Sequence, residues 1–233
     1  MTSLSPIDAA ALGWFLVCWT AFNWLVGHSR WKHRTLSHTM DGYRHAWMLA
    51  MRERPMRMVD TQIISGLQQG TAFFASTALL ALGGGFAMLN ATERVLELYA
   101  DLPFSIAMTR GQWEAKVLGL MMIFAYTFFK FGWAYRLFNY CSILVGAVPH
   151  DTTPTPHALA MAEKAAAMNI LAGRHFNQGQ RALFFSIGFM SWFAGPLPFV
   201  AVTSCVTLVL TRRQFFSNAL EAARTPTGEN NQV

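Results

Sequence analysis

Long apolar runs broken by very few charges are the feature that most restricts how this chain of 233 residues can fold. A transmembrane helix needs about 20 consecutive, mostly apolar residues, because the hydrocarbon core of a bilayer is about 30 Å thick. The chain offers four such stretches, at about residues 9–26, 62–89, 113–135 and 182–210. Charged residues make up only 13% of the chain, too few to cover a soluble domain. We therefore expect an all-α polytopic membrane bundle with about four transmembrane helices. It forms one domain over residues 1–213, followed by a polar tail at 214–233.

Two of these apolar stretches are irregular. The helical pattern that begins at Trp113 continues to about Gly146, and a helix of that length is about 50 Å long. Such a helix must tilt strongly, break, or project from the membrane. The last stretch is interrupted at Gly195-Pro-Leu-Pro198. The interruption leaves two interpretations open, one kinked span or a re-entrant hairpin, and we favour the single span.

Positive charge is unevenly distributed along the chain, whose formal net charge is +6 at pH 7. Lysine and arginine are in excess at residues 28–59 and 136–181, whereas residues 90–115 are acidic. Cytoplasmic loops are enriched in Lys and Arg, so we expect both basic segments in the cytoplasm of a bacterial inner membrane and residues 90–115 outside. Four spans then place both termini outside. The basic surface predicts contact with anionic lipid head groups, and not with nucleic acid.

The basic segments should contain helices of their own. Apolar residues recur at helical spacing over 40–51, which predicts an amphipathic helix that lies on the membrane or packs beneath the bundle and ends at Pro55. Asp60 is the expected N-cap of the next span. A second, alanine-rich helix should begin at Pro156 and end at Gly173.

Several short motifs occur together over most of the chain. They are Arg52-Glu-Arg54 with Val59-Asp60, Phe73-Phe-Ala-Ser-Thr77, Lys130-Phe-Gly-Trp-Ala-Tyr-Arg-Leu-Phe-Asn-Tyr140, Asn177-x-Gly-x-Arg181 and Trp192-Phe-Ala-Gly-Pro196. In combination they resemble the membrane-protein family called domain of unknown function 599, over about residues 13–210. The resemblance implies a multi-pass membrane protein of bacteria or plants. It carries no expectation of an activity, so the function has to be argued from the residues.

A polar stripe runs along the second apolar stretch. Gln62, Ser65 and Gln69 lie on roughly one side of the predicted helix, together with Gly66 and Gly70. Small residues let transmembrane helices approach closely, and a glutamine can bond across to a neighbouring helix. The stripe therefore predicts either ordinary helix packing or the polar lining of a pore in a homo-oligomer.

Basic residues next to the apolar stretches are the second group of candidates. Lys130 and Arg136 are about 120° apart around a helix, so they either reach separately to the interface or contribute to a cationic vestibule between subunits. Arg174 and Arg181 are seven residues apart and share a helical face, with Asn177 between them. This group predicts either interfacial anchoring or a site for a lipid phosphate or another anion.

Residues that point to metal or catalytic chemistry are sparse. His38, Asp41 and His45 share a helical face and form a weak candidate metal site, although the surrounding arginines would repel a cation. No nucleophile elbow, phosphate-binding loop or HExxH pattern occurs, so we expect no catalytic residue and no cofactor. The three cysteines lie in apolar runs and are interpreted as small core residues.

Three classes of function remain compatible with this pattern. The leading hypothesis is an oligomeric channel or transporter for an ion or a small anionic solute. The alternative is a non-catalytic scaffold or accessory subunit that docks a partner membrane protein through its Trp- and Phe-rich spans. A membrane enzyme is the third class, and a bound metal or cofactor would support it.

Overall fold

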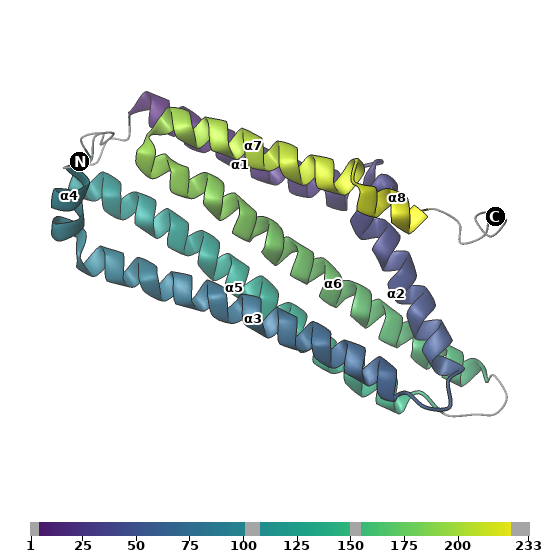
Figure 1. The fold of residues 1–233 in the computed structure, drawn as a ribbon. Helices are drawn as coiled ribbons and strands as arrows, with labels where there is room; N and C mark the ends of the chain where they lie inside the picture. The colour runs from purple at the N-terminus through teal and green to yellow at the C-terminus, as the bar shows by residue number, and fades with distance from the viewer. Residues whose placement is uncertain (1–4, 101–107, 150–154, 225–233) are drawn as a thin grey trace, which may run out of the picture.

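The structure is a computed structural model that describes residues 5–100, 108–149 and 155–224. These residues form long helices and contain no strand, which confirms an all-α fold (Figure 1). In chain order the elements are α1 (Pro6–Gly27), the 3-10 turn η1 (Lys32–Arg34), α2 (Leu36–Arg52), α3 (Met58–Asn90), α4 (Thr92–Ala100), α5 (Arg110–Ala147), α6 (Pro156–Met190), the 3-10 turn η2 (Ser191–Ala194), α7 (Pro196–Phe215) and α8 (Asn218–Arg224).

Four helical segments are long and apolar enough to cross a membrane. They are Pro6–Gly27, Met58–Asn90, Arg110–Ala147 and Pro196–Arg224, so the expectation of about four transmembrane helices is confirmed. Helix α5 has 38 residues and is therefore about 57 Å long without a break. In Figure 1, α3 and α5 extend well past the ends of α1 and α7. Of the alternatives for the overlong helix, a break is excluded.

The last apolar stretch turns back on itself near its middle and forms a hairpin, so the preferred single span at 182–210 is wrong. Helix α6 runs unbroken for 35 residues to Met190, straight through Gly173, where we had expected it to end. After η2 the chain reverses at Gly195, whose φ of 117° is a conformation that side chains other than glycine rarely adopt. Helix α7 then runs back alongside α6 and next to α1 (Figure 1).

Contacts on both sides hold this hairpin. The Trp192 indole Nε1–H donates to Asp8 at 2.8 Å, and the Trp192 carbonyl accepts from the Lys116 ammonium at 2.9 Å. The Trp192 ring also stacks on Phe199, with centroids 5.0 Å apart. The turn is therefore tied to α1, α5 and α7.

The two ends of the bundle differ in their elements. We call the end at which α2 and α8 lie the α2 end, and the opposite end, with α4 and η2, the α4 end (Figure 1). Helix α1 begins at the α4 end, whereas α8 packs on α2, where the Tyr43 hydroxyl donates to the carbonyl of Ala223 at 2.9 Å. The described ends of the chain thus lie at opposite ends of the bundle, contrary to the expectation that both termini share one side. The expected polar tail at 214–233 contains the last residues of α7 and the helix α8. Residues 150–154, between α5 and α6, and the last residues, 225–233, lie outside the described residues.

The core has two main parts. An aromatic cluster fills the space between α1, α6 and α7, with Phe15, Phe189 and Trp192 among its members. At the α2 end, Met48 and Met51 of α2 are fully buried against α3, α5 and α6. The amphipathic helix therefore packs against the extended ends of the bundle.

Two further residues differ from expectation. Asp60 is not an N-cap: α3 begins at Met58, and the Asp60 carboxylate is fully buried, accepting bonds from Trp47 at 2.7 Å and Arg54 at 2.6 Å. Cys205 is exposed on α7 and is not a core residue, in contrast to the two buried cysteines.

Candidate anion-binding site

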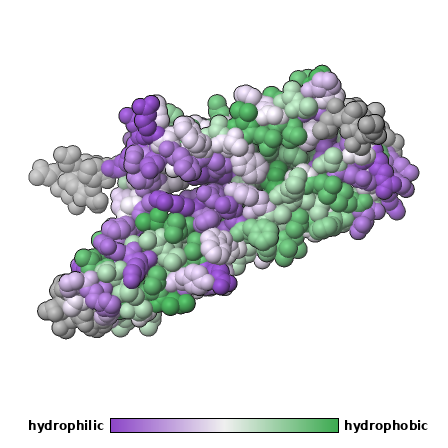
Figure 2. Space-filling view, turned by 180° about the vertical axis from the view of Figure 1, so that it is seen from behind, coloured by the Kyte–Doolittle hydropathy of each residue, from purple (hydrophilic) through white to green (hydrophobic). Residues whose placement is uncertain are grey.

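A polar cleft lies where the middle of α6 faces the first turns of α2. It consists of two cavities of about 300 Å³ each, on either side of α2, both lined by Ser37, Asp41, Asn177 and Arg181. Seen from behind, hydrophilic residues gather along a hollow between the two arms of the molecule (Figure 2). The polar segment of α6 thus lines a recess and not a flat surface.

Arg181 lies at the base of this cleft and is 91% buried, with 9% of its surface exposed. Its guanidinium lies over the Phe22 ring, 5.7 Å from the centroid, and one Nη donates to the Asn23 side-chain oxygen at a long 3.5 Å. Its Nε–H has no partner among the residues that the structure describes. A buried cation without an anionic partner is costly, so this position favours an anion.

The other polar residues of α6 face α2. The Arg174 guanidinium donates to Asp41 at 2.9 Å, and the Asn177 amide donates to the Ser37 hydroxyl at 3.5 Å. Because α6 is unbroken, Arg174, Asn177 and Arg181 all line the same cavity, as their spacing predicted.

The first turn of α2 supplies backbone donors to the cleft. Thr35 caps this helix by accepting from the His38 N–H at 3.2 Å. The Ser37 N–H points instead to the side-chain oxygen of Gln214 on α7, at 3.3 Å. Helix N-termini bind anions through such N–H groups and through the helix dipole. An amide oxygen therefore already occupies one of the places that suits an anionic oxygen.

Arg44 borders the cleft on the α2 side. Its guanidinium donates to the fully buried Asn169, lies over the Phe138 ring at 5.9 Å and packs directly on Gly173. Burial lowers the pKa of Arg44, and the Asp41 carboxylate partly opposes that shift.

The charge of the lining is strongly unbalanced. Five basic side chains line the two cavities, against one carboxylate, that of Asp41. The basic residues are Lys32, Arg44, Arg174, Arg181 and Arg213. A concave site with this excess of positive charge attracts small anions.

The predicted polar stripe of α3 lies elsewhere. Gln62 and Gln69 are exposed, and Gln69 donates only to Ser65 of its own helix, at 3.3 Å. The buried residues of α3 form a different line, which includes Asp60 and Ile64. The stripe faces away from the other helices of the chain and takes no part in the cleft.

Lys130 and Arg136 also lie outside the cleft, on different sides of α5. The Lys130 ammonium sits 5.2 Å from the centroid of the Tyr126 ring, and the Arg136 Nε donates to the Tyr140 hydroxyl at 2.7 Å. Each cation is thus held by an aromatic residue one helical turn away.

The weak candidate metal site is wrong. His38 pairs with His33, with ring nitrogens 3.0 Å apart, and Asp41 is engaged by Arg174. No group of three His, Cys, Asp or Glu residues within the described ranges could hold a metal ion.

Sequence reasoning missed Arg44, Ser37 and Gln214. Arg44 had a readable signal: it precedes Met48 by four residues and Met51 by seven, so it shares the buried face of α2. Ser37 and Gln214 had none, because they are 177 residues apart and meet only through the hairpin.

Comparison with known proteins gives one match. The family model described as "Protein of unknown function, DUF599" matches residues 10–219, which include both the cleft and the hairpin. No curated protein and no solved structure matches the chain.

Proposed function

The chain belongs to the DUF599 family of proteins of unknown function, and we propose that this member binds a small anion in the polar cleft and carries it across the bilayer. The observation that carries the proposal is Arg181, a guanidinium that is 91% buried and whose Nε–H is unpaired within the described part of the chain. It lies in a recess that holds four further cations and a helix N-terminus.

The proposal includes an orientation. Lysine and arginine cluster at the α2 end, in η1, α2 and the last turn of α7, whereas the α4 end has Arg94 of α4 and Arg110 and Lys116 at the start of α5. The positive-inside rule then puts the α2 end, and the mouth of the cleft, in the cytoplasm of a bacterial inner membrane.

An anion in the cleft would be bound by groups that are already oriented. An oxyanion next to Arg181 can accept a hydrogen bond from the Nε–H, which has no partner among the described residues. The Arg174 guanidinium lines the same cavity. A second oxygen of the anion can accept from the Ser37 N–H in place of the Gln214 side chain. This exchange breaks the hydrogen bond that joins α2 to the side chain on α7. Binding is thus coupled to the contact between these two helices.

Passage across the membrane requires a second conformation. On the α4 side of Arg181, the aromatic cluster of α1, α6 and α7 fills the interior, so the cleft opens toward the α2 end. We propose that the hairpin of α6 and α7, hinged at Gly195, moves to expose the bound anion on the other side.

The experiment is binding followed by flux. Purified protein in detergent is titrated with inorganic phosphate, sulfate and chloride by calorimetry, and proteoliposomes are then loaded with radiolabelled phosphate or sulfate. Saturable binding of an oxyanion, lost in Arg181→Gln and partly kept in Arg181→Lys, together with flux that depends on Arg181, is the expected result.

The matched control is Arg136→Gln, which removes an exposed arginine outside the cleft. It should bind and transport as the unchanged protein does. Equal binding by Arg181→Gln and the unchanged protein would overturn the site, and binding without any flux would overturn the transport step.

The outer face of α3 favours a second, independent role. Gln62 and Gln69 are exposed along a helix with open space beside Gly66 and Gly70, and polar side chains in a bilayer find partners on another helix. We propose that this face docks a second copy or a partner membrane protein. Purification in a mild detergent tests it: Gln69→Leu should weaken the assembly, and an unchanged monomer in both forms would exclude the role.

A further inference from the structure

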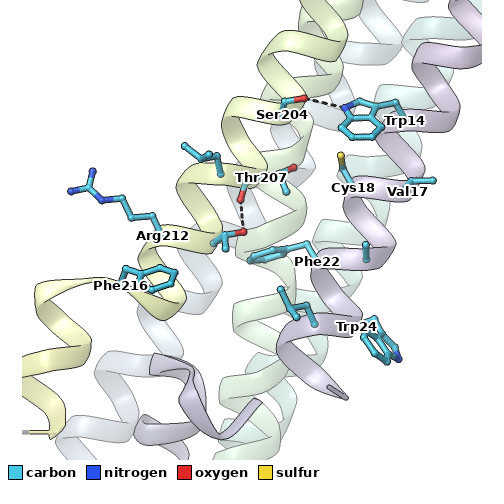
Figure 3. A pocket seen from close by; sticks show the side chains of 13 residues that line it. Trp14, Val17, Cys18, Phe22, Trp24, Ser204, Thr207, Arg212 and Phe216 are labelled. Atoms are coloured by element: carbon cyan, nitrogen blue, oxygen red, sulfur yellow. Dashed lines mark hydrogen bonds between the residues drawn. The ribbon is translucent and has the colours of Figure 1, made fainter. Parts of the chain in front are cut away.

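A long apolar groove runs between α1 and α7 (Figure 3). Its volume is about 820 Å³, and Val17, Phe22 and Leu208 are among the apolar residues that line it. In Figure 3 the side chains of Trp14 and Trp24 stand along its α1 wall. One end is bridged by the Trp14 indole, whose Nε1–H donates to the Ser204 hydroxyl at 3.0 Å.

The other end of the groove is basic. There Arg212 and Phe216 line the groove, and a neighbouring cavity of about 510 Å³ shares Phe216 and adds Arg34 and Arg224. Arg34 and Arg212 form no ion pair within the described residues, and Arg34 only lies over the ring of Trp31, 5.5 Å from its centroid. Along its length the groove therefore changes from mostly apolar to cationic.

We propose that this groove binds an anionic glycerophospholipid, with one acyl chain between α1 and α7 and the phosphate at Arg34, Arg212 and Arg224. Both walls are helices long and apolar enough to span a membrane, so the groove faces the acyl chains of the bilayer. The groove is apolar first and cationic toward the α2 end. A lipid in one leaflet has the same order, with its acyl chains in the membrane interior and its phosphate at the surface. A protein partner would not require that order.

The lipid site is separate from the polar cleft. Helix α7 presents Arg213 and Gln214 to the cleft but Thr207 and Arg212 to the groove. Phe22 lies between the two sites. The Arg181 guanidinium of the cleft lies over its ring, and the same side chain lines the groove. A lipid in the groove therefore supports the wall behind Arg181.

The test uses delipidated full-length protein and native mass spectrometry. The protein is mixed with equal amounts of phosphatidylglycerol and phosphatidylcholine that carry the same acyl chains. We expect preferential retention of phosphatidylglycerol, reduced about fivefold for each cation removed in Arg34→Gln and Arg212→Gln. Ala21→Trp, which fills the groove, should reduce retention of both lipids.

Two matched controls separate the groove from the rest of the surface. Arg136→Gln removes an exposed arginine of α5, and Ala87→Trp enlarges an exposed alanine of α3, neither of which lines the groove. Both should retain phosphatidylglycerol as the unchanged protein does. The arginine variants lie on the surface, so they test the proposal even if Ala21→Trp fails to fold.

Other outcomes overturn the proposal. Equal retention of the two lipids, or a preference that survives loss of both arginines, excludes a phosphate at this end of the groove. Lipid retention that is unchanged in a folded Ala21→Trp variant excludes the groove as the acyl-chain site. A stable dimer that Ala21→Trp disrupts would show that a second copy fills the groove instead.

Discussion

The guanidinium of Arg44 packs directly on Gly173 of α6, where an added methyl group would come within 2.9 Å of the guanidinium carbon. The contact joins α2 to the middle of α6 and holds Arg44 at the edge of the cleft, next to its acceptor Asn169. It also explains why a glycine stands inside this helix, at a cost of about 1 kcal/mol relative to alanine.

The variant Gly173→Ala should weaken anion binding without unfolding the protein. The new methyl group meets the end of a flexible side chain, so Arg44 moves away from the cleft while the helices stay in place. We expect a severalfold lower affinity for the oxyanion in calorimetry and a melting temperature close to that of the unchanged protein. Gly132→Ala, which meets no atom within 4 Å, is the control. A large loss of stability with unchanged affinity would contradict this role of Arg44.

Asp60 is expected to stabilise the α2 end of the bundle. Replacing it with alanine leaves the Trp47 N–H without its acceptor and removes the partner of Arg54. The expected cost is about 2 kcal/mol, measured by unfolding in sodium dodecyl sulfate with circular dichroism. Replacing Arg54 instead leaves the fully buried Asp60 carboxylate without its cation, so we expect that variant to cost at least as much. A clearly smaller cost for the Arg54 variant would show that the Trp47 indole is enough to hold the buried carboxylate.

The hairpin depends on Gly195. Its φ of 117° and ψ of 171° lie in a region reserved for glycine, so Gly195→Ala should cost about 1–3 kcal/mol. If the hinge also serves transport, flux through proteoliposomes should fall more than oxyanion binding does. The same readouts for Gly132→Ala should be neutral, because that glycine is inside a helix with open space beside it. If Gly195→Ala and Gly132→Ala changed stability and flux equally, the turn at Gly195 would have no special role.

The helices were largely predictable from the sequence because hydrophobicity and length are local properties. The apolar runs and the face that buries Met48 and Met51 depend on spacing within one helix. The interruption at 195–198 leaves a hairpin open as an alternative, but the single span is preferred because rules for single spans assign each apolar run to its own crossing. The first half of α6 is rich in alanine and lies outside the predicted spans, and it is buried because α2 and α5 pack against it.

The cleft was only half predictable, for the same physical reason. Arg174, Asn177 and Arg181 share a face of α6, and their spacing predicts this. Their environment comes from long-range contacts: Asn23, which bonds Arg181, is 158 residues away in the chain. No local pattern indicates that Asp41 lies against Arg174 and not in a metal site.

The proposed orientation can be checked by labelling. Glu97 and Ala222 are exposed at the α4 end and the α2 end, respectively. In intact cells a membrane-impermeant maleimide should label Glu97→Cys and leave Ala222→Cys unlabelled, because the basic α2 end is cytoplasmic. The unchanged chain supplies the background from its own cysteines. Labelling of both positions only after lysis, or the reverse pattern, would contradict the orientation.

Asp41 is the one carboxylate in the cleft lining, and its replacement separates two possible roles. If Asp41 competes with the anion for Arg174, Asp41→Asn frees that guanidinium and raises the affinity for an oxyanion by about fivefold. The gain should shrink as salt is added, because screening weakens charge interactions. Glu53→Gln, which removes an exposed carboxylate outside the cleft, should change nothing. Weaker binding by Asp41→Asn would instead mean that Asp41 holds Arg174 in position, since an asparagine cannot anchor the guanidinium with a charge.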